Sequence, residues 1–161
     1  RMKLIIAPHE IHQSHLVSIA ALLERPFIRL TEVQSEKDLE GKDCLIIDNF
    51  GLLSSVYRYG EMAYIGGGFG VGIHNTLEAA VYGIPVLFGP NYKKFKEAKD
   101  LIEVGGGFSI HSIAEFEDKM NEFITHPEVM QAAGKAAGDF VASQVGATDK
   151  ILSDILPALD H

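Results

Sequence analysis

Residues 62–90 read MAYIGGGFGVGIHNTLEAAVYGIPVLFGP, and the fold of the chain can be read outward from them. Residues 62–65 and 84–88 are short and largely apolar, which is the pattern of strands buried on both faces of a sheet. Between them, residues 75–82 carry apolar side chains at helical spacing, and Gly83 follows as a helix stop. Two buried strands joined through a helix predict a parallel βαβ unit.

The alternation of strand-like and helix-like segments continues on both sides of this unit. Apolar strands alternating with amphipathic helices predict an α/β fold, in which a Rossmann-like parallel sheet has helices on both faces and extra helices follow at the C-terminal end. The further strand candidates are residues 3–7, 26–30, 44–48 and a short strand after 105–108; the further helix candidates are residues 14–24, 51–59, 95–103, 113–124, 129–140 and 151–159, with His126-Pro127 as a break before the last two.

The composition limits the classes of function. A length of 161 residues fits one domain, and 47% apolar residues argue against disorder. The net charge of −8 and the lack of a long basic run argue against nucleic-acid binding. No apolar run reaches the roughly 18 residues of a membrane span, and no signal peptide is expected. The one cysteine, Cys44, lies in an apolar run, which predicts a core residue and a reducing, cytoplasmic location.

Five of the eight residues 65–72 are glycine, at the point where a strand gives way to a helix. Ligands of open parallel sheets bind at the carboxyl ends of the strands, where this loop is expected. Glycine lets main-chain N–H groups approach a ligand, and a helix start adds unpaired donors and partial positive charge. These features predict a phosphate site. The spacing is neither GxGxxG in a first βα unit nor GxxxxGK[ST], which disfavours ordinary dinucleotide and ATP sites.

Three polar residues, His74, Asn75 and Glu78, follow the glycines. If Asn75 caps the helix, Glu78 stands at its third position and returns a hydrogen bond to the cap, as in a capping box. In the functional alternative, the Glu78 carboxylate accepts hydrogen bonds from the ribose hydroxyls of a nucleotide. His74 is either structural or donates a hydrogen bond to a phosphate.

A second loop, residues 89–100, follows the next strand and contains Lys93, Lys94, Lys96 and Lys99. These lysines form either a solvated helix face or a contact with an anionic ligand. Because the two loops follow consecutive strands, we expect both to line one crevice.

Metal-ligand patterns are sparse in this sequence. No acidic cluster such as DxD occurs, so no metal requirement is expected. His9, His12 and His15 recur every three residues near a helix start, which leaves a metal site there as an alternative to structural histidines.

Five stretches of the sequence carry a resemblance to a known family. Residues 66–67 read GG and residues 72–78 read GIHNTLE, followed by GIPVLFGP at residues 83–90 and by Phe95-Lys96. Upstream, residues 48–57 read DNFGLLSSVY. Together they resemble the C-terminal, donor-binding half of the 3-deoxy-D-manno-octulosonic acid (Kdo) transferases, which are GT-B glycosyltransferases of lipopolysaccharide biosynthesis. In this chain Ile73 replaces a glycine of the family pattern, and Pro8-His9-Glu10 lacks the family's arginine.

The resemblance implies a role for each candidate residue. The glycine loop and the helix start would bind the phosphate of CMP-Kdo, Glu78 would bind the ribose, and the 48–53 segment would contact cytosine through its backbone. The implied donor-nucleotide residues are Gly66, Gly67, Gly68, His74, Asn75, Glu78, Asp48, Gly51 and Leu53, and the candidate anion contacts in place of the missing arginine are His9, Lys94 and Lys96.

The resemblance also implies the activity of the complete enzyme. It would transfer Kdo from CMP-Kdo to a lipid A precursor, inverting the anomeric centre, with no cofactor and no metal. The catalytic base would be a carboxylate of an N-terminal acceptor domain. Residues 1–161 are therefore expected to be a single nucleotide-sugar-binding domain, a soluble fragment with no catalytic residue of its own. Acceptor and membrane contact would come through the missing part, at the cytoplasmic face of the bacterial inner membrane.

Two alternatives stay open. Another GT-B enzyme that uses a UDP-sugar, such as a transferase or a UDP-N-acetylglucosamine 2-epimerase, shares the glycine loop, the glutamate and the G-x-P pattern. A non-catalytic nucleotide-binding domain is the second alternative.

Overall fold

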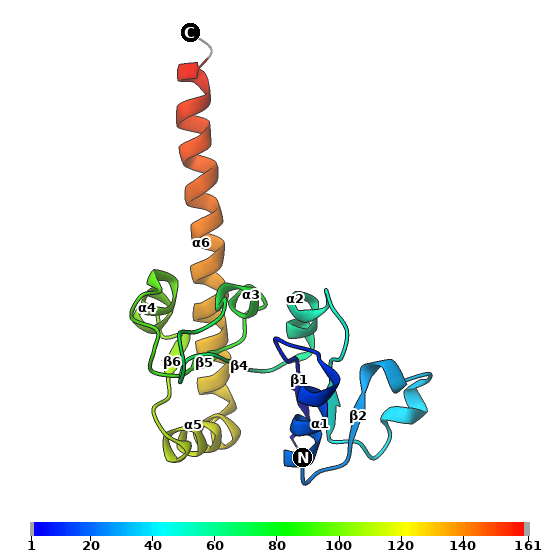
Figure 1. The fold of residues 1–161 in the computed structure, drawn as a ribbon. Helices are drawn as coiled ribbons and strands as arrows, with labels where there is room; N and C mark the ends of the chain where they lie inside the picture. The colour runs from blue at the N-terminus through cyan, green and yellow to red at the C-terminus, as the bar shows by residue number, and fades with distance from the viewer. Residues whose placement is uncertain (1, 160–161) are drawn as a thin grey trace. The chain divides into compact units, whose positions relative to one another are not determined.

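The structure is a computed structural model that describes the backbone of residues 2–159 and the side chains of residues 2–146. The chain divides into two compact units, residues 1–56 and residues 57–161. Each unit contains a three-stranded parallel sheet, with strand orders β1-β3-β2 and β4-β5-β6 (Figure 1). The predicted α/β fold with parallel strands is confirmed, but its strands form two sheets where one was predicted. A single nucleotide-sugar-binding domain over residues 1–161 stays a prediction.

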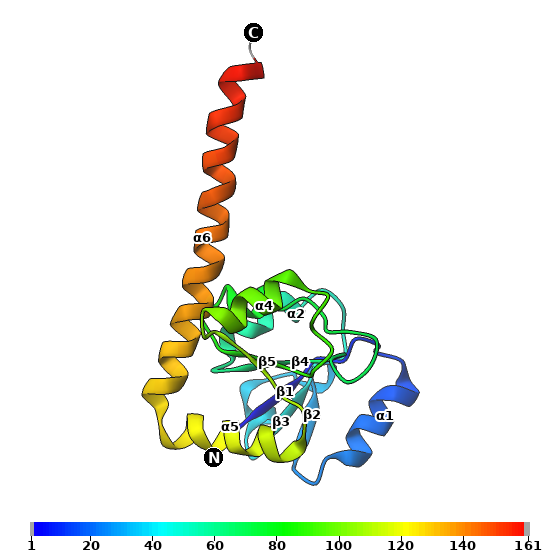
Figure 2. The same ribbon diagram turned by 90° about the vertical axis from the view of Figure 1, so that its left-hand side faces the viewer.

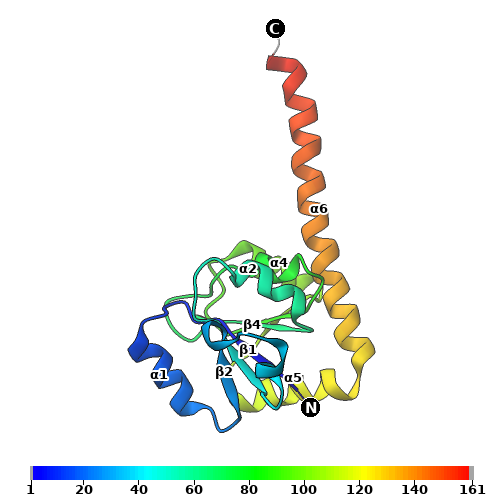
Figure 3. The same ribbon diagram turned by 90° about the vertical axis from the view of Figure 1, so that its right-hand side faces the viewer.

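The first unit packs one helix against one face of its sheet (Figure 3). Leu16 of α1 is buried together with Cys44 and Ile46 of β3. Burial raises the pKa of the Cys44 thiol, as expected of the predicted core cysteine. The elements are β1 (Leu4–Ile6), α1 (Gln13–Leu22), β2 (Phe27–Arg29), the 3-10 turns η1 (Leu30–Glu32) and η2 (Glu36–Leu39), β3 (Cys44–Ile46) and α2 (Leu53–Val56).

The second unit has helices on both faces of its sheet (Figures 1 and 2). Alternate residues of a strand point to opposite faces. Accordingly, Val86 and Phe88 of β5 pack in the core cluster that includes α3 and α4, whereas Leu87 packs with Phe123 of α5 and Ala133 of α6. The elements are η3 (Tyr57–Tyr59), β4 (Ala63–Ile65), α3 (Leu77–Ala80), β5 (Val86–Phe88), α4 (Lys96–Glu103), β6 (Gly107–Ser109), α5 (Ile113–Thr125) and α6 (Pro127–Leu159).

Two helix predictions are wrong in extent. The helices predicted over residues 129–140 and 151–159 are one continuous helix, α6, because the residues between them include no proline and can continue the helical hydrogen bonds. The helix predicted over residues 75–82 shortens to the four residues of α3 and ends in turns before Gly83, whose φ is +69°. The side chains of Ile151, Leu152, Ile155 and Leu159, which suggested a separate last helix, lie outside the described side chains.

Within the second unit, the helix α6 packs closely against the backbone at Gly83. A Cβ atom built on Gly134 would lie 2.3 Å from the carbonyl oxygen of Gly83, which is shorter than the contacts that Cβ atoms make in proteins. On Gly146, in the same helix, it would meet nothing within 4 Å.

The two glycines predict opposite effects on stability. Gly134→Ala should lower the free energy of unfolding by about 1–2 kcal/mol, since overpacking exceeds the gain in helix propensity. Gly146→Ala should raise the same free energy by up to about 1 kcal/mol. Chemical denaturation followed by circular dichroism measures both, and equal stability of the two variants would contradict the proposed contact between α6 and Gly83.

Candidate functional site

The glycine loop, residues 66–73, leaves β4 at its C-terminal end and leads into α3. Two main-chain N–H groups, those of Gly70 and Gly72, donate to the carbonyl oxygen of Gly67 at 2.9 and 3.2 Å. Gly67 has φ of +87°, and a Cβ atom there would lie 2.2 Å from the Gly72 carbonyl oxygen. The folding of the loop on itself therefore already requires glycine at position 67, apart from any ligand.

A second glycine of the loop is explained by the neighbouring loop. A Cβ atom on Gly68 would lie 2.5 Å from the backbone nitrogen of Gly89. Similarly, a Cβ atom on Gly72 would lie 3.0 Å from the ring of Phe95. The two loops thus lie side by side, because the glycine loop packs on the Gly89 backbone and on the Phe95 ring. The single crevice that both were expected to line stays a prediction.

Gly66 differs from these glycines. Its φ is not positive, and a Cβ atom built on it would have one neighbour within 4 Å, the His74 ring carbon Cδ2 at 3.8 Å. The residue is exposed at the end of β4. Because neither backbone strain nor internal packing requires glycine here, position 66 is open for close approach by a ligand. His74 is also exposed, and its N–H donates to the Gly66 carbonyl oxygen at 3.2 Å.

Asn75 and Glu78 form a pair at the start of α3, but not the capping box that was one of the two alternatives for them. The Asn75 Oδ1 atom accepts a hydrogen bond from the Leu77 N–H at 3.0 Å, and its Nδ2 group donates to Glu78 Oε1 at 3.1 Å. Glu78 is therefore oriented by the Asn75 amide group, where a capping box uses the backbone N–H of the cap residue. Both polar groups of Asn75 are engaged within the protein, whereas Glu78 keeps a second carboxylate oxygen for a ligand.

Tyr57 and Thr76 lie near this pair and add to its electrostatics. The pKa of the Tyr57 hydroxyl is raised by burial and, to a smaller extent, by the negative charge of Glu78. Thr76 is almost fully buried, and its hydroxyl has no hydrogen-bond partner within the described part of the chain. The Glu78 carboxylate at the start of α3 thus lies near a partly buried tyrosine and follows a buried threonine.

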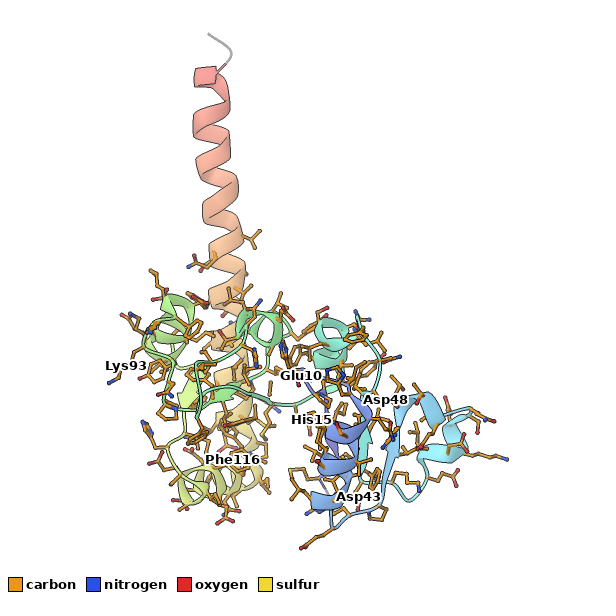
Figure 4. All side chains as sticks on the ribbon, viewed as in Figure 1. Glu10, His15, Asp43, Asp48, Lys93 and Phe116 are labelled. Carbon is orange, nitrogen blue, oxygen red and sulfur yellow. The ribbon has the colours of Figure 1, made fainter. Side chains whose placement is uncertain are left out.

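The lysines of the second loop separate into two groups. Lys96 pairs with Asp100 one turn later on α4, and this hydrogen bond raises the pKa of its ammonium group. Lys96 therefore fits the solvated helix face better than an anion contact. Lys93 and Lys94 are exposed in the turn before α4, and the side chain of Lys93 points outward (Figure 4). Lys94 has no ion-pair partner among the residues whose side chains are described.

Four predicted residues, His9, Asp48, Gly51 and Leu53, belong to the first unit. The Asp48 carboxylate accepts hydrogen bonds from the Thr31 N–H at 3.0 Å and from the Thr31 hydroxyl at 2.5 Å, and Figure 4 labels it after β3. Its side chain is thus used within its own unit. Gly51 has φ of +85°, Leu53 begins α2, and His9 is exposed between β1 and α1. Contact of residues 48–53 with cytosine through the backbone stays a prediction.

The surface depression beside α5 is less suited to a nucleotide, because it has three carboxylates and one lysine, a charge that disfavours phosphate. It is lined by Ser109, Ile110, Glu115, Asp118, Lys119 and Glu122. Among the described side chains, no group of three His, Cys, Asp or Glu residues is arranged to hold a metal ion. In the part of the chain that the structure describes, no helix has the length and hydropathy needed to cross a membrane.

Sequence reasoning missed two residues that shape the site, Asn91 and Tyr57. Asn91 donates hydrogen bonds to the glycine loop. In the sequence, its position after Gly89-Pro90 predicts only a turn and not this contact. Tyr57 is part of the 48–57 stretch that carries the family resemblance. Its distance from Glu78 along the chain gives no indication that the two residues lie close together.

Comparison with known proteins gives sequence relatives and a similar structure. No model of a known protein family matches the chain. It is 34% identical over 126 residues to the 3-deoxy-D-manno-octulosonic acid transferase of Aquifex aeolicus, a match covering 77% of this chain and 34% of that protein. The transferase of the same name from Bordetella pertussis is 31% identical over 112 residues, covering 68% of this chain and 26% of that protein. The chain thus spans about a third or less of these relatives.

The fold also matches a solved structure, the C-terminal CMP-Kdo binding domain of WaaA from Acinetobacter baumannii. The TM-score is 0.72 at 19% sequence identity, and the match covers 86% of this chain and 88% of that one. At this identity the likeness supports the fold, and the candidate residues stand on the geometry above.

Proposed function

We propose that this chain, which belongs to the 3-deoxy-D-manno-octulosonic acid transferase family, is the part of such a glycosyltransferase that binds the CMP-Kdo donor. The observation that carries the proposal is the 34% identity to the Aquifex aeolicus transferase over 77% of the chain. A match of that extent in a chain of 161 residues necessarily includes residues 62–90, and with them the glycine loop and Glu78.

The glycine loop is the proposed phosphate site. Gly66 lets the backbone come close to the ligand, and exposed His74 stands beside it. Because α3 has only four residues, its dipole adds little, and the donors are the main-chain N–H groups of the loop itself. Lys94 is the candidate for added positive charge near the phosphate.

Glu78 is the proposed ribose ligand. The Asn75 amide group holds one carboxylate oxygen, so the other can accept from a ribose hydroxyl. Asn75 then acts as a positioning residue for Glu78, since its Nδ2 group donates to Glu78 Oε1 while its Oδ1 atom accepts from the Leu77 N–H.

The complete enzyme would transfer Kdo to a hydroxyl group of a lipid A precursor, with inversion at the anomeric carbon. This chain would stabilise the negative charge that develops on the departing CMP. The catalytic base, the acceptor site and the contact with the cytoplasmic face of the inner membrane are proposed to come from the rest of the protein. We propose that neither a cofactor nor a metal is required.

Calorimetric titration with CMP and with UDP tests the proposed donor. The chain should bind CMP, and UDP should bind at least tenfold more weakly, a difference of about 1.4 kcal/mol. A preference for UDP would instead indicate a UDP-sugar enzyme, and binding of neither nucleotide would remove the donor-site proposal.

A further inference from the structure

Asn91 reaches the glycine loop through two hydrogen bonds. Its backbone N–H donates to the Gly68 carbonyl oxygen at 2.9 Å, and its side-chain Nδ2 group donates to the Gly70 carbonyl oxygen at 2.6 Å. The residue is exposed, so these bonds are not a consequence of burial in a core. One residue thus binds two alternate carbonyl groups of a loop about twenty positions earlier in the chain.

The loop does not hold these two carbonyl groups by itself. Its internal hydrogen bonds from Gly70 and Gly72 both end on the Gly67 carbonyl oxygen. The Gly68 and Gly70 carbonyl oxygens have Asn91 as their hydrogen-bond donor. Because glycine has wide conformational freedom, a peptide group next to it can rotate when nothing binds it.

Fixing a carbonyl group also fixes the next N–H group. In a planar trans peptide, the C=O of one residue and the N–H of the following residue point in opposite directions. The bonds to Asn91 therefore turn the N–H groups of Phe69 and Val71 away from the segment that carries Asn91. Neither N–H group donates to an acceptor within the described part of the chain. Both remain available to an anionic ligand.

We propose that Asn91 is a positioning residue that sets the peptide orientations of the glycine loop and so keeps the Phe69 and Val71 N–H groups directed toward the donor phosphate. The identity of the ligand rests on the proposed function, whereas the effect of Asn91 on the loop does not. Asn91 acts through the loop and need not touch the nucleotide.

Asn91→Leu tests the side-chain part of this role, the bond to the Gly70 carbonyl oxygen, because leucine has a similar size and keeps the backbone N–H but lacks the side-chain donor. In the whole chain, nitrogen-15 NMR should show altered amide signals for residues 68–72, and calorimetry should show a dissociation constant for CMP raised about three- to tenfold. Asn121→Leu is the matched control, since this exposed asparagine lies on α5 and its side chain makes no hydrogen bond to the part of the chain that the structure describes. It should change neither the loop signals nor the affinity.

The two measurements separate failure of this role from failure of the proposed function. Unchanged amide signals at residues 68–72 in Asn91→Leu would overturn the positioning role, and so would altered signals with native CMP affinity. If the native chain binds no CMP, the proposed function fails, and the loop signals alone decide whether Asn91 sets the loop conformation.

Discussion

Gly66→Val should weaken CMP binding by about 100-fold or more while the chain keeps a thermal unfolding temperature close to the native value. The loss follows if the phosphate lies against the backbone at this position, because the valine side chain would displace it from two or more charge-assisted hydrogen bonds. The fold should tolerate the change, since Gly66 has no positive φ and its nearest neighbour would lie 3.8 Å from the new Cβ. Calorimetry and a thermal melt on the same sample measure both.

Two further variants control for size and for loop strain. Gly66→Ala should show an intermediate loss of affinity, because its side chain is smaller. Gly67→Val should disturb the loop itself, since its φ is +87° and its Cβ would collide with the Gly72 carbonyl oxygen. Native affinity in a folded Gly66→Val variant would place the phosphate elsewhere.

Glu78→Gln should raise the dissociation constant for CMP by about 5- to 150-fold, corresponding to roughly 1–3 kcal/mol. Glutamine can still accept the hydrogen bond from Asn75, so the start of α3 should be preserved. The change removes the negative charge and thus the charge-assisted hydrogen bonds proposed for the ribose hydroxyls. Calorimetric titration of native and variant protein gives the difference, and equal affinities would leave Glu78 a purely structural partner of Asn75.

Two controls belong with this variant. Glu115→Gln changes a comparable glutamate at the start of α5, where the carboxylate accepts a hydrogen bond from the His111 N–H at 2.8 Å, and it should leave CMP affinity unchanged. In Glu78→Gln, the pKa of Tyr57 should fall below its native value, because the Glu78 charge disfavours the phenolate and contributes to raising that pKa. NMR titration of the Tyr57 ring in the native chain and in the variant measures this pKa difference, and it checks that Glu78 lies near Tyr57 as in the structure.

Most of the fold could be predicted because buried parallel strands leave a strong apolar pattern. Residues 84–88 pack on both faces of a sheet, so almost every side chain there is apolar. The length of α3 could not be predicted, since apolar spacing over residues 75–82 fits a turn as well as a helix. The division into two sheets was equally hidden, because a strand's own sequence does not specify its neighbours.

The sequence offers a candidate position for the site, which stays a prediction, more readily than the role of each residue in it. The glycines marked the loop, but their spacing does not say which of them serves the fold. The structure assigns Gly67 and Gly68 to backbone packing and leaves Gly66 open, a distinction that depends on the distant residues Gly72 and Gly89. Asn75 and Glu78 were expected to interact, yet the bond runs through the Asn75 side chain, which spacing along a helix cannot reveal.

The most direct measurement is a crystal structure of this chain with CMP bound. We predict that the phosphate lies within hydrogen-bonding distance of main-chain N–H groups of residues 66–73 and that a ribose hydroxyl donates to the Glu78 carboxylate. A nucleotide bound in the depression beside α5, or one whose phosphate makes no contact with the glycine loop, would contradict the donor-site assignment.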